Sequence, residues 1–115
     1  MNSTTTKLRT TLETIQLTEL VRGQDEWLLE RVMPLVSHQD VCLDLSSVER
    51  IDAAGIAALI SLYSIANSTG HFFTICGASQ RVVEILALVG LDGILLSHNA
   101  VINPHSGSQF ERPAA

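Results

Sequence analysis

The chain has 115 residues, of which 46% are hydrophobic and 4% aromatic, and its formal net charge is −5. This length suits a single domain whose aliphatic core needs neither a metal nor a disulfide. Nucleic acid and anionic membrane surfaces are not expected as partners, because both attract clustered Lys and Arg and the seven basic residues here are scattered.

The sequence predicts a cytoplasmic protein that does not insert into a membrane. Residues 1–11 are Thr-rich, lack the apolar stretch of a secretory signal, and are expected to be a flexible arm. The folded domain is expected over residues 12–97, and residues 98–115 form a predicted flexible tail. No apolar run approaches the ~20 residues of a membrane span. Cys42 and Cys76 fall in predicted strands and are expected to be reduced core residues, with a redox pair as the alternative.

The first two predicted elements are a strand and a helix. Residues 12–21 alternate apolar and polar side chains, which predicts one strand. Asp25 is placed to cap a helix from about Glu26, whose apolar residues repeat at helical spacing. Pro34 lies within that pattern, and we expect it to kink or end the helix near Met33.

A buried strand and a long helix are predicted next. Residues 41–45 are mostly apolar, which indicates a central strand buried on both faces, with Asp44 near its carboxyl end. Apolar residues between Ile56 and Ile65 then recur at helical spacing and predict a deeply packed helix. Gly70 is expected to end this helix in a left-handed cap.

The last part repeats this alternation. Residues 72–76 form a predicted strand, Gly77 turns the chain, and Ser79 caps a second packed helix that Gly90 closes. A short final strand is expected over residues 94–96.

The fold class is therefore α/β, a single small parallel or mixed sheet with helices packed on it. Right-handed crossovers should bring the loops 46–52 and 77–79 to the same rim of this sheet, where open α/β sheets usually bind their partners.

No motif in the sequence predicts a catalytic site, a metal site or a cofactor. The four histidines are far apart, the cysteines form no CxxC pair, and there is neither a Gly-x-Ser-x-Gly elbow nor a phosphate-binding loop. Asp44, Glu49 and Asp52 could serve as an acid/base pair. Turn and cap roles are the simpler interpretation of these carboxylates.

The strongest functional candidate is the segment 44–55, which joins a predicted strand to a helix. Asp52 suits an N-cap whose carboxylate accepts N–H bonds from residue 54 or 55. The small residues at 53–55 leave the first helical turn open to another protein, and close packing within the domain is an equal alternative.

Several blocks carry a family resemblance: Asp44-Leu45-Ser46-x-Val48-x-x-Ile51-Asp52-x-x-Gly55-Ile56, an aliphatic helix, Gly70, and Val82-x-x-Ile85-Leu86-x-x-x-Gly90-Leu91. Over roughly residues 12–97 they resemble the STAS domain, the fold of bacterial anti-sigma-factor antagonists. The resemblance implies a non-catalytic protein-binding module in transcription regulation and signalling, with an anti-sigma factor or serine-kinase-like protein, or another STAS partner, as its target.

In such relatives a kinase phosphorylates a serine just before the motif glycine, which releases the antagonist. Ala54 stands at that position here and Ala53 precedes it, so the resemblance implies a domain that lacks this switch. Ser46 and Ser47 lie on the same loop and could be alternative phosphosites, although a serine in this motif is more often a turn residue. The predicted partner-binding face consists of Ser46, Ser47, Arg50, Asp52, Ala53, Ala54, Gly55 and Ser79.

Two other functions stay open. A STAS subunit of an ABC-type lipid transport complex would need no phosphoserine, which suits the two alanines. A small nucleotide-binding STAS domain or enzyme could use Asp44, Ser46, Ser47 and Asp52. The chain also departs from many relatives, with one predicted strand before its first helix where they have two, and a Pro- and Gly-bearing tail where they carry a helix. Either difference could uncover an apolar face or a sheet edge, which favours a homodimer or a larger assembly.

Overall fold

The structure is a computed structural model that describes residues 10–96. Its elements, in chain order, are β1 (Thr10–Thr14), β2 (Glu19–Leu20), α2 (Gln24–Val36), β3 (Asp40–Leu45), β4 (Arg50–Ile51), α3 (Ala53–Ser68), β5 (Phe73–Ala78), α4 (Gln80–Leu88) and α5 (Asp92–Leu95). Three parallel strands form the main sheet in the order β1-β3-β5, and β2 pairs with β4 in a second, two-stranded parallel sheet. The predicted α/β class is confirmed.

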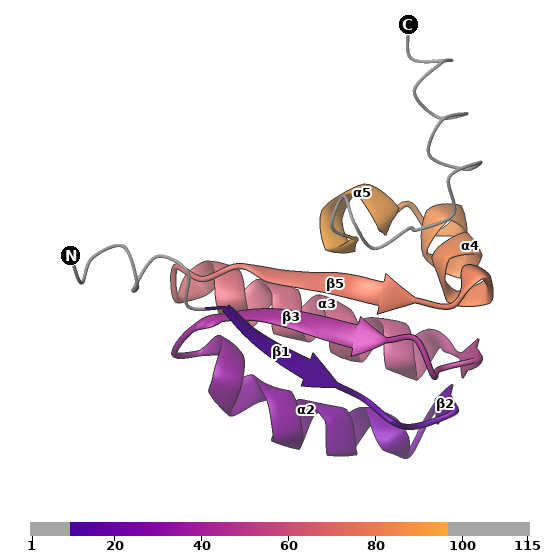
Figure 1. The fold of residues 1–115 in the computed structure, drawn as a ribbon, viewed down its shortest axis with the longest axis horizontal. Coiled ribbons are helices and arrows are strands. Elements are labelled where there is room, and N and C mark those ends of the chain that lie inside the picture. The colour runs from indigo at the N-terminus through magenta and orange to yellow at the C-terminus, as the bar shows by residue number, and fades with distance from the viewer. Residues whose placement is uncertain (1–9, 97–115) are drawn as a thin grey trace, which may run out of the picture.

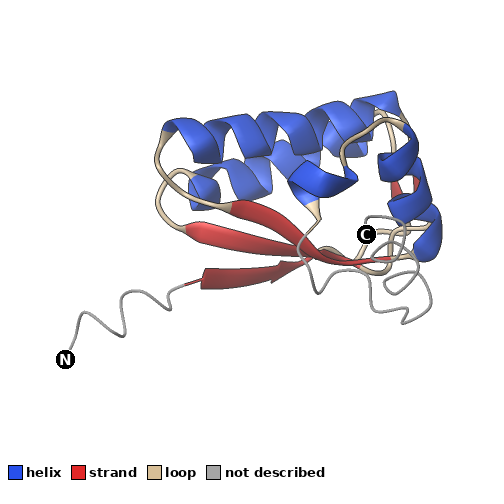
Figure 2. Cartoon of the chain, turned by 90° about the horizontal axis from the view of Figure 1, so that it is seen from above, coloured by secondary structure: helices blue, strands red, loops and turns tan. Residues whose placement is uncertain are grey.

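Helices α2 and α3 lie side by side behind the three-stranded sheet (Figure 1). Within residues 10–96 the opposite face of this sheet is left open, as the view from above shows (Figure 2). Burial along β3 follows this arrangement, because Val41, Leu43 and Leu45 are buried whereas Cys42 and Asp44 are partly exposed. The central position of this strand is confirmed. Its expected burial on both faces is wrong, since both long helices pack on the same side.

The core is aliphatic, as the composition predicts. Both long helices contribute a buried stripe, which consists of Leu28, Val32 and Val36 from α2, and of Gly55, Ala58, Leu59, Leu62 and Ala66 from α3. Phe73 is the one aromatic side chain among the buried residues of the described part. Pro34 does not end α2, which continues to Val36. The main-chain bond that proline removes lies in the last turn on an exposed side, where water can replace it.

Two strands stand where the sequence predicts one over residues 12–21. Directly after β1 the N–H of Ile15 still donates to the carbonyl of Asp44 in β3, at 3.0 Å. Beyond this residue the chain leaves the main sheet. It then forms β2, in which Leu20 pairs with Ile51. The prediction of a single strand is wrong. The chain has two strands before its first long helix, as is expected of many relatives, so the predicted difference from them is wrong as well. Apolar and polar residues alternate on both sides of the break, so the pattern does not mark it.

Helix α2 begins at Gln24 rather than at about Glu26, and Asp25 is not its N-cap. Gly23 takes that position with a φ of 110°, a left-handed conformation that favours glycine. The carboxylate of Asp25 accepts a hydrogen bond from the Gly23 N–H at 2.8 Å. The predicted left-handed caps at Gly70 and Gly90 are confirmed by φ values of 81° and 79°.

Strand β5 extends through Ala78, so Gly77 does not turn the chain as predicted. The register shifts instead: Leu43 pairs with Ile75 and the next residue of β3 pairs with Gly77, which leaves Cys76 as the extra residue of a β-bulge. The strand expected over residues 94–96 is also wrong. Residues up to 95 form helix α5, and Leu96 makes a single parallel bridge to Ile75.

Candidate functional site

The two loops that the sequence assigns to one rim are joined there by Ser79. Its hydroxyl donates to the carbonyl of Val48 at 2.8 Å and accepts from the N–H of Val82, in the first turn of α4, at 3.3 Å. The predicted N-cap role of Ser79 is therefore confirmed. Because the same oxygen also holds the loop 46–49 against α4, Ser79 makes the rim a connected unit.

Asp52 is the N-cap of α3, as predicted, and it also anchors a distant part of the chain. One carboxylate oxygen accepts from the N–H of Gly55 at 3.0 Å, and the other accepts from the N–H of Arg22 at 3.0 Å. These two donors, Gly55 first, hold the pKa of Asp52 below its ordinary value because they stabilise the ionised form. Asp52 thus ties the segment after β2 to the first turn of α3.

Gly55 is explained by packing within the domain. A Cβ atom at this position would collide with the carbonyl oxygen of Leu20 and would lie 2.8 Å from a side-chain carbon of Ile51. Gly55 is itself buried. Of the two interpretations of the small residues at 53–55, close packing therefore accounts for the glycine, which offers no surface to a partner.

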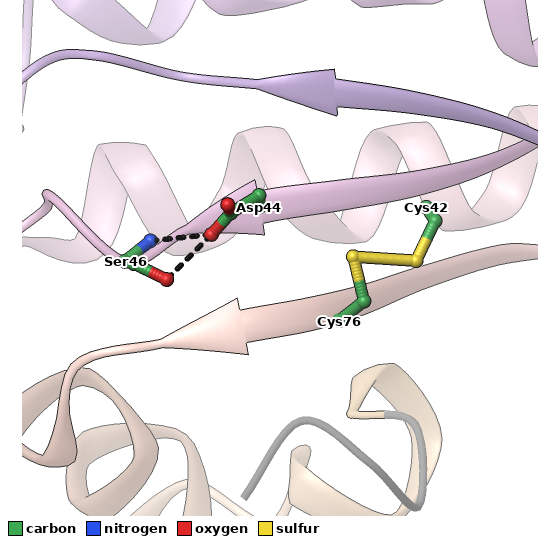
Figure 3. Close-up of a disulfide and its surroundings, with 4 residues drawn as sticks. All are labelled: Cys42, Asp44, Ser46 and Cys76. Carbon is green, nitrogen blue, oxygen red and sulfur yellow. Dashed lines mark hydrogen bonds between the residues drawn. A yellow bond between two sulfur atoms is a disulfide. The ribbon is translucent and has the colours of Figure 1, made fainter. Parts of the chain in front are cut away.

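A second close approach shapes the end of β3. One carboxylate oxygen of Asp44 accepts from the main-chain N–H of Ser46 at 2.9 Å and from its hydroxyl at 2.5 Å (Figure 3). A Cβ atom on Gly77 would lie 2.6 Å from that carboxylate oxygen and 2.8 Å from the Ser46 hydroxyl oxygen. The turn role of Asp44 is confirmed, and Gly77 is the residue that leaves room for this turn.

The residues of the predicted partner-binding face fall into two groups, those that hold the loops in place and those that are exposed to solvent. Ser46, Ser47, Arg50 and Ala53 are exposed, and Ala54 is half-buried beside them. The partly buried side chains of Asp52 and Ser79 hold the loops from below. The sequence does not predict three residues that adjoin this face. The carboxylate of Glu19 pairs with Arg50 at 3.2 Å, and main-chain groups of Leu20 and Arg22 contact the start of α3. Their proximity depends on the pairing of β2 with β4, for which the sequence carries no separate signal.

The two cysteines depart from expectation. Cys42 in β3 and Cys76 in β5 are joined as a disulfide with a Cα–Cα distance of 5.6 Å (Figure 3). The expectation of reduced core residues is wrong, since the two cysteines are joined and the alternation along β3 and β5 places both on the open face of the sheet, where each is partly exposed.

Residues 10–96 contain neither a candidate metal site nor a candidate membrane-spanning helix. No group of three or more His, Cys, Asp or Glu side chains is arranged to hold a metal ion. No helix among these residues combines the length and the apolar character that crossing a membrane requires.

Comparison with protein families identifies the domain. Residues 6–97 match the family described as "Mlab, STAS domain". The chain belongs to the STAS domain family. The parallel sheet, the helices packed on one of its faces and the Asp52 cap all stand within the matched segment, so the resemblance drawn from the sequence is confirmed.

Curated relatives of this STAS domain are of two kinds. Over 55 residues it is 34% identical to the intermembrane phospholipid transport system binding protein MlaB of Escherichia coli (strain K12), and equally to the MlaB of Shigella flexneri. This match covers 48% of the chain and 57% of each relative. Over 64 residues it is 27% identical to a putative anti-sigma factor antagonist of Thermotoga maritima, with 56% of the chain and 57% of the relative covered. The chain thus spans little more than half the length of these relatives.

Proposed function

We propose that this STAS domain is a non-catalytic docking subunit, and that its partner binds the exposed rim around the first turn of α3. The observation that carries the proposal is the construction of that turn. Asp52 and Gly55 fix it against the segment after β2, while Ala53 is exposed to solvent, as are Ser46, Ser47 and Arg50 in the connection that leads to it. A rigid turn loses little conformational entropy on binding, and a methyl group lets a partner approach closely.

The same contacts argue against catalysis at this rim. Two of the three carboxylates that could act as an acid/base pair accept hydrogen bonds from the domain itself, Asp44 from Ser46 and Asp52 from Gly55 and Arg22. The third, Glu49, is exposed to solvent. Among the described hydrogen bonds no serine is bonded to a histidine, and the hydroxyl that is, Thr69 with the His71 ring at 3.2 Å, lies at the opposite end of α3 from this rim. A small nucleotide is a weaker candidate as well, because the rim lacks a glycine-rich loop with converging N–H groups.

We assign the partner to a lipid-transport assembly and take it to be a protein subunit of that assembly. The matched family carries the MlaB name, and the relative from Escherichia coli is named as a binding protein of an intermembrane phospholipid transport system. Ala54 supports this choice because it cannot be phosphorylated. A permanently unmodified docking surface suits a constant subunit better than a cycle of binding and release.

Partner switching with an anti-sigma factor is the second candidate, and the Thermotoga maritima relative favours it. Ser46 and Ser47 are exposed on the same rim and are the residues that a kinase could reach. Intact-mass measurement after incubation with the serine kinases of the source organism separates the two functions. Our proposal predicts no phosphate on residues 44–55, with an Ala54→Ser variant as the control for kinase competence. Phosphate on Ser46 or Ser47 of the wild type would favour the second candidate.

The docking proposal is tested by affinity purification of tagged protein from cells of its source. Asp52 is a poor probe because its loss would also disturb the fold, so the test uses Ala53→Arg. Asn67→Arg is a matched control on the same helix, exposed and about 21 Å further along the axis at a rise of ~1.5 Å per residue. We expect wild type and Asn67→Arg to retain an ATPase or permease subunit of a lipid transporter and Ala53→Arg to lose it. Equal retention by all three would refute the docking site.

A further inference from the structure

The disulfide lies on the two strands that lead into the docking rim, since Cys42 precedes Ser46 in the chain and Cys76 precedes Ser79. Cys42 and Cys76 come from neighbouring strands and are separated by 34 positions, and they are the two cysteines of the whole chain. The Cα–Cα distance of 5.6 Å is within the ordinary range for a disulfide. Each residue is partly exposed on the open face of the sheet, which is the side from which an external thiol would approach.

The bulge connects this pair to the rim. Cys76 is the extra residue of β5, and the next residue, Gly77, is the one that makes room for the Asp44 carboxylate and the Ser46 hydroxyl. On the other strand, Cys42 precedes Asp44 by two positions and shares its face of the sheet. Figure 3 shows the disulfide between the two strands and, further along β3, the Asp44–Ser46 turn. A covalent link between Cys42 and Cys76 therefore restrains the bulge that directly precedes Gly77, the residue that leaves room for the turn.

We propose that Cys42 and Cys76 form a reversible redox site that sets the rigidity of the docking rim. In the disulfide form the bulge is fixed, and Ser46 and Ser47 are held beside the first turn of α3. In the dithiol form the bulge is held by main-chain bonds alone, and the turn at Asp44 opens more often. This inference assigns a regulation to the site of the proposed function and depends on that proposal for its consequence in binding.

The reaction is thiol–disulfide exchange with a cellular dithiol. A thiolate of the donor attacks one sulfur of the pair and forms a mixed disulfide, and the other cysteine leaves as a thiolate that takes up a proton. The second donor thiol then attacks the mixed disulfide and releases the remaining cysteine, which is protonated in turn. Two electrons and two protons pass to Cys42 and Cys76, and the donor ends as its own disulfide.

The first test follows the thiols. Wild-type protein is equilibrated in mixtures of reduced and oxidised dithiothreitol, alkylated, and weighed intact. We expect the monomer to pass reversibly from no alkyl group to two as the fraction of reduced reagent rises. A protein that stays fully alkylated in every mixture, one that never reacts, or one that forms disulfide-linked dimers would each overturn the proposal.

The second test reads the rim without any partner, by amide hydrogen exchange in the oxidised and reduced states. We expect exchange at Ser46 and Gly77 to be roughly three- to tenfold faster after reduction, with α2 unchanged. A Cys42→Ser/Cys76→Ser variant should resemble the reduced protein in either reagent, and Thr74→Ser, on the same face, should still respond as wild type. Equal exchange rates in both states would overturn the proposed effect of the disulfide on the rim. The docking proposal would not be affected by that result, because it is tested separately by affinity purification.

Discussion

The close contact between Gly55 and Leu20 leads to a prediction opposite to the usual rule for glycine in a helix. Replacing an interior glycine by alanine ordinarily stabilises a helix by about 1 kcal/mol. Here the new methyl group would occupy the space of the Leu20 carbonyl oxygen and lie 2.8 Å from a side-chain carbon of Ile51. Leu20 is fully buried, so β2 cannot move aside without disturbing the core.

The size of the effect follows from these opposing contributions. Overpacking of this kind costs about 1–3 kcal/mol. Displacing β2 also breaks the bond from the Asp52 N–H to the Leu20 carbonyl, 3.4 Å long, which is worth about 1 kcal/mol. After the gain in helix propensity, Gly55→Ala should therefore destabilise the domain by roughly 1–3 kcal/mol.

Urea unfolding followed by circular dichroism measures this change through the midpoint at constant slope. Gly93→Ala is the matched control, because Gly93 lies in α5 with a negative φ and open space around its Cα. That variant should be neutral or slightly more stable than wild type. A Gly55→Ala protein as stable as wild type would refute the claim that this glycine is required by packing.

Two further predictions concern the caps of the rim. Asp52→Asn keeps the shape of the N-cap and removes its charge. Because folding lowers the pKa of Asp52, the ionised carboxylate stabilises the protein at pH values above the ordinary carboxylate pKa of about 4. This stabilisation is lost as the pH falls through the pKa of the folded protein. The stability difference from wild type in urea should thus be present at pH 7 and shrink at pH 3, and an equal difference at both would contradict the assignment. Ser79→Ala removes a cap and the donor to Val48, so thermal and urea unfolding should show a loss of about 1–2 kcal/mol. Ser61→Ala, on the exposed side of α3, should stay within about 0.5 kcal/mol of wild type, and an equal loss in both variants would show that Ser79 has no special role.

The features that the sequence predicts correctly are those set by residues close together in the chain. Asp52, Ser79, Gly70 and Gly90 act on helix ends within a few positions of themselves, so their roles could be assigned from spacing alone. The aliphatic core follows from the same local periodicity. The position of Asp44 at the end of a strand was likewise sufficient to predict its turn.

The features that the sequence does not predict depend on contacts between distant segments of the chain. Nothing near residue 20 indicates that Leu20 packs on Gly55, so the purpose of that glycine could not be decided in advance. The proximity of Cys76 to Cys42 depends on the pairing and register of β3 and β5, which a one-dimensional pattern does not contain. The break between β1 and β2 was missed for the same reason, because both sides of it alternate in the same way.

The docking rim at Ala53 is the central claim, and cross-linking from that position tests it most directly. A photoreactive side chain is introduced at position 53 or, as the control on the same helix, at position 67, and cells of the source organism are irradiated before the products are identified by mass spectrometry. The account predicts a cross-link from position 53 to a protein subunit of a lipid transporter and none from position 67. Cross-links from position 67 alone, or none from position 53 to any protein, would contradict it.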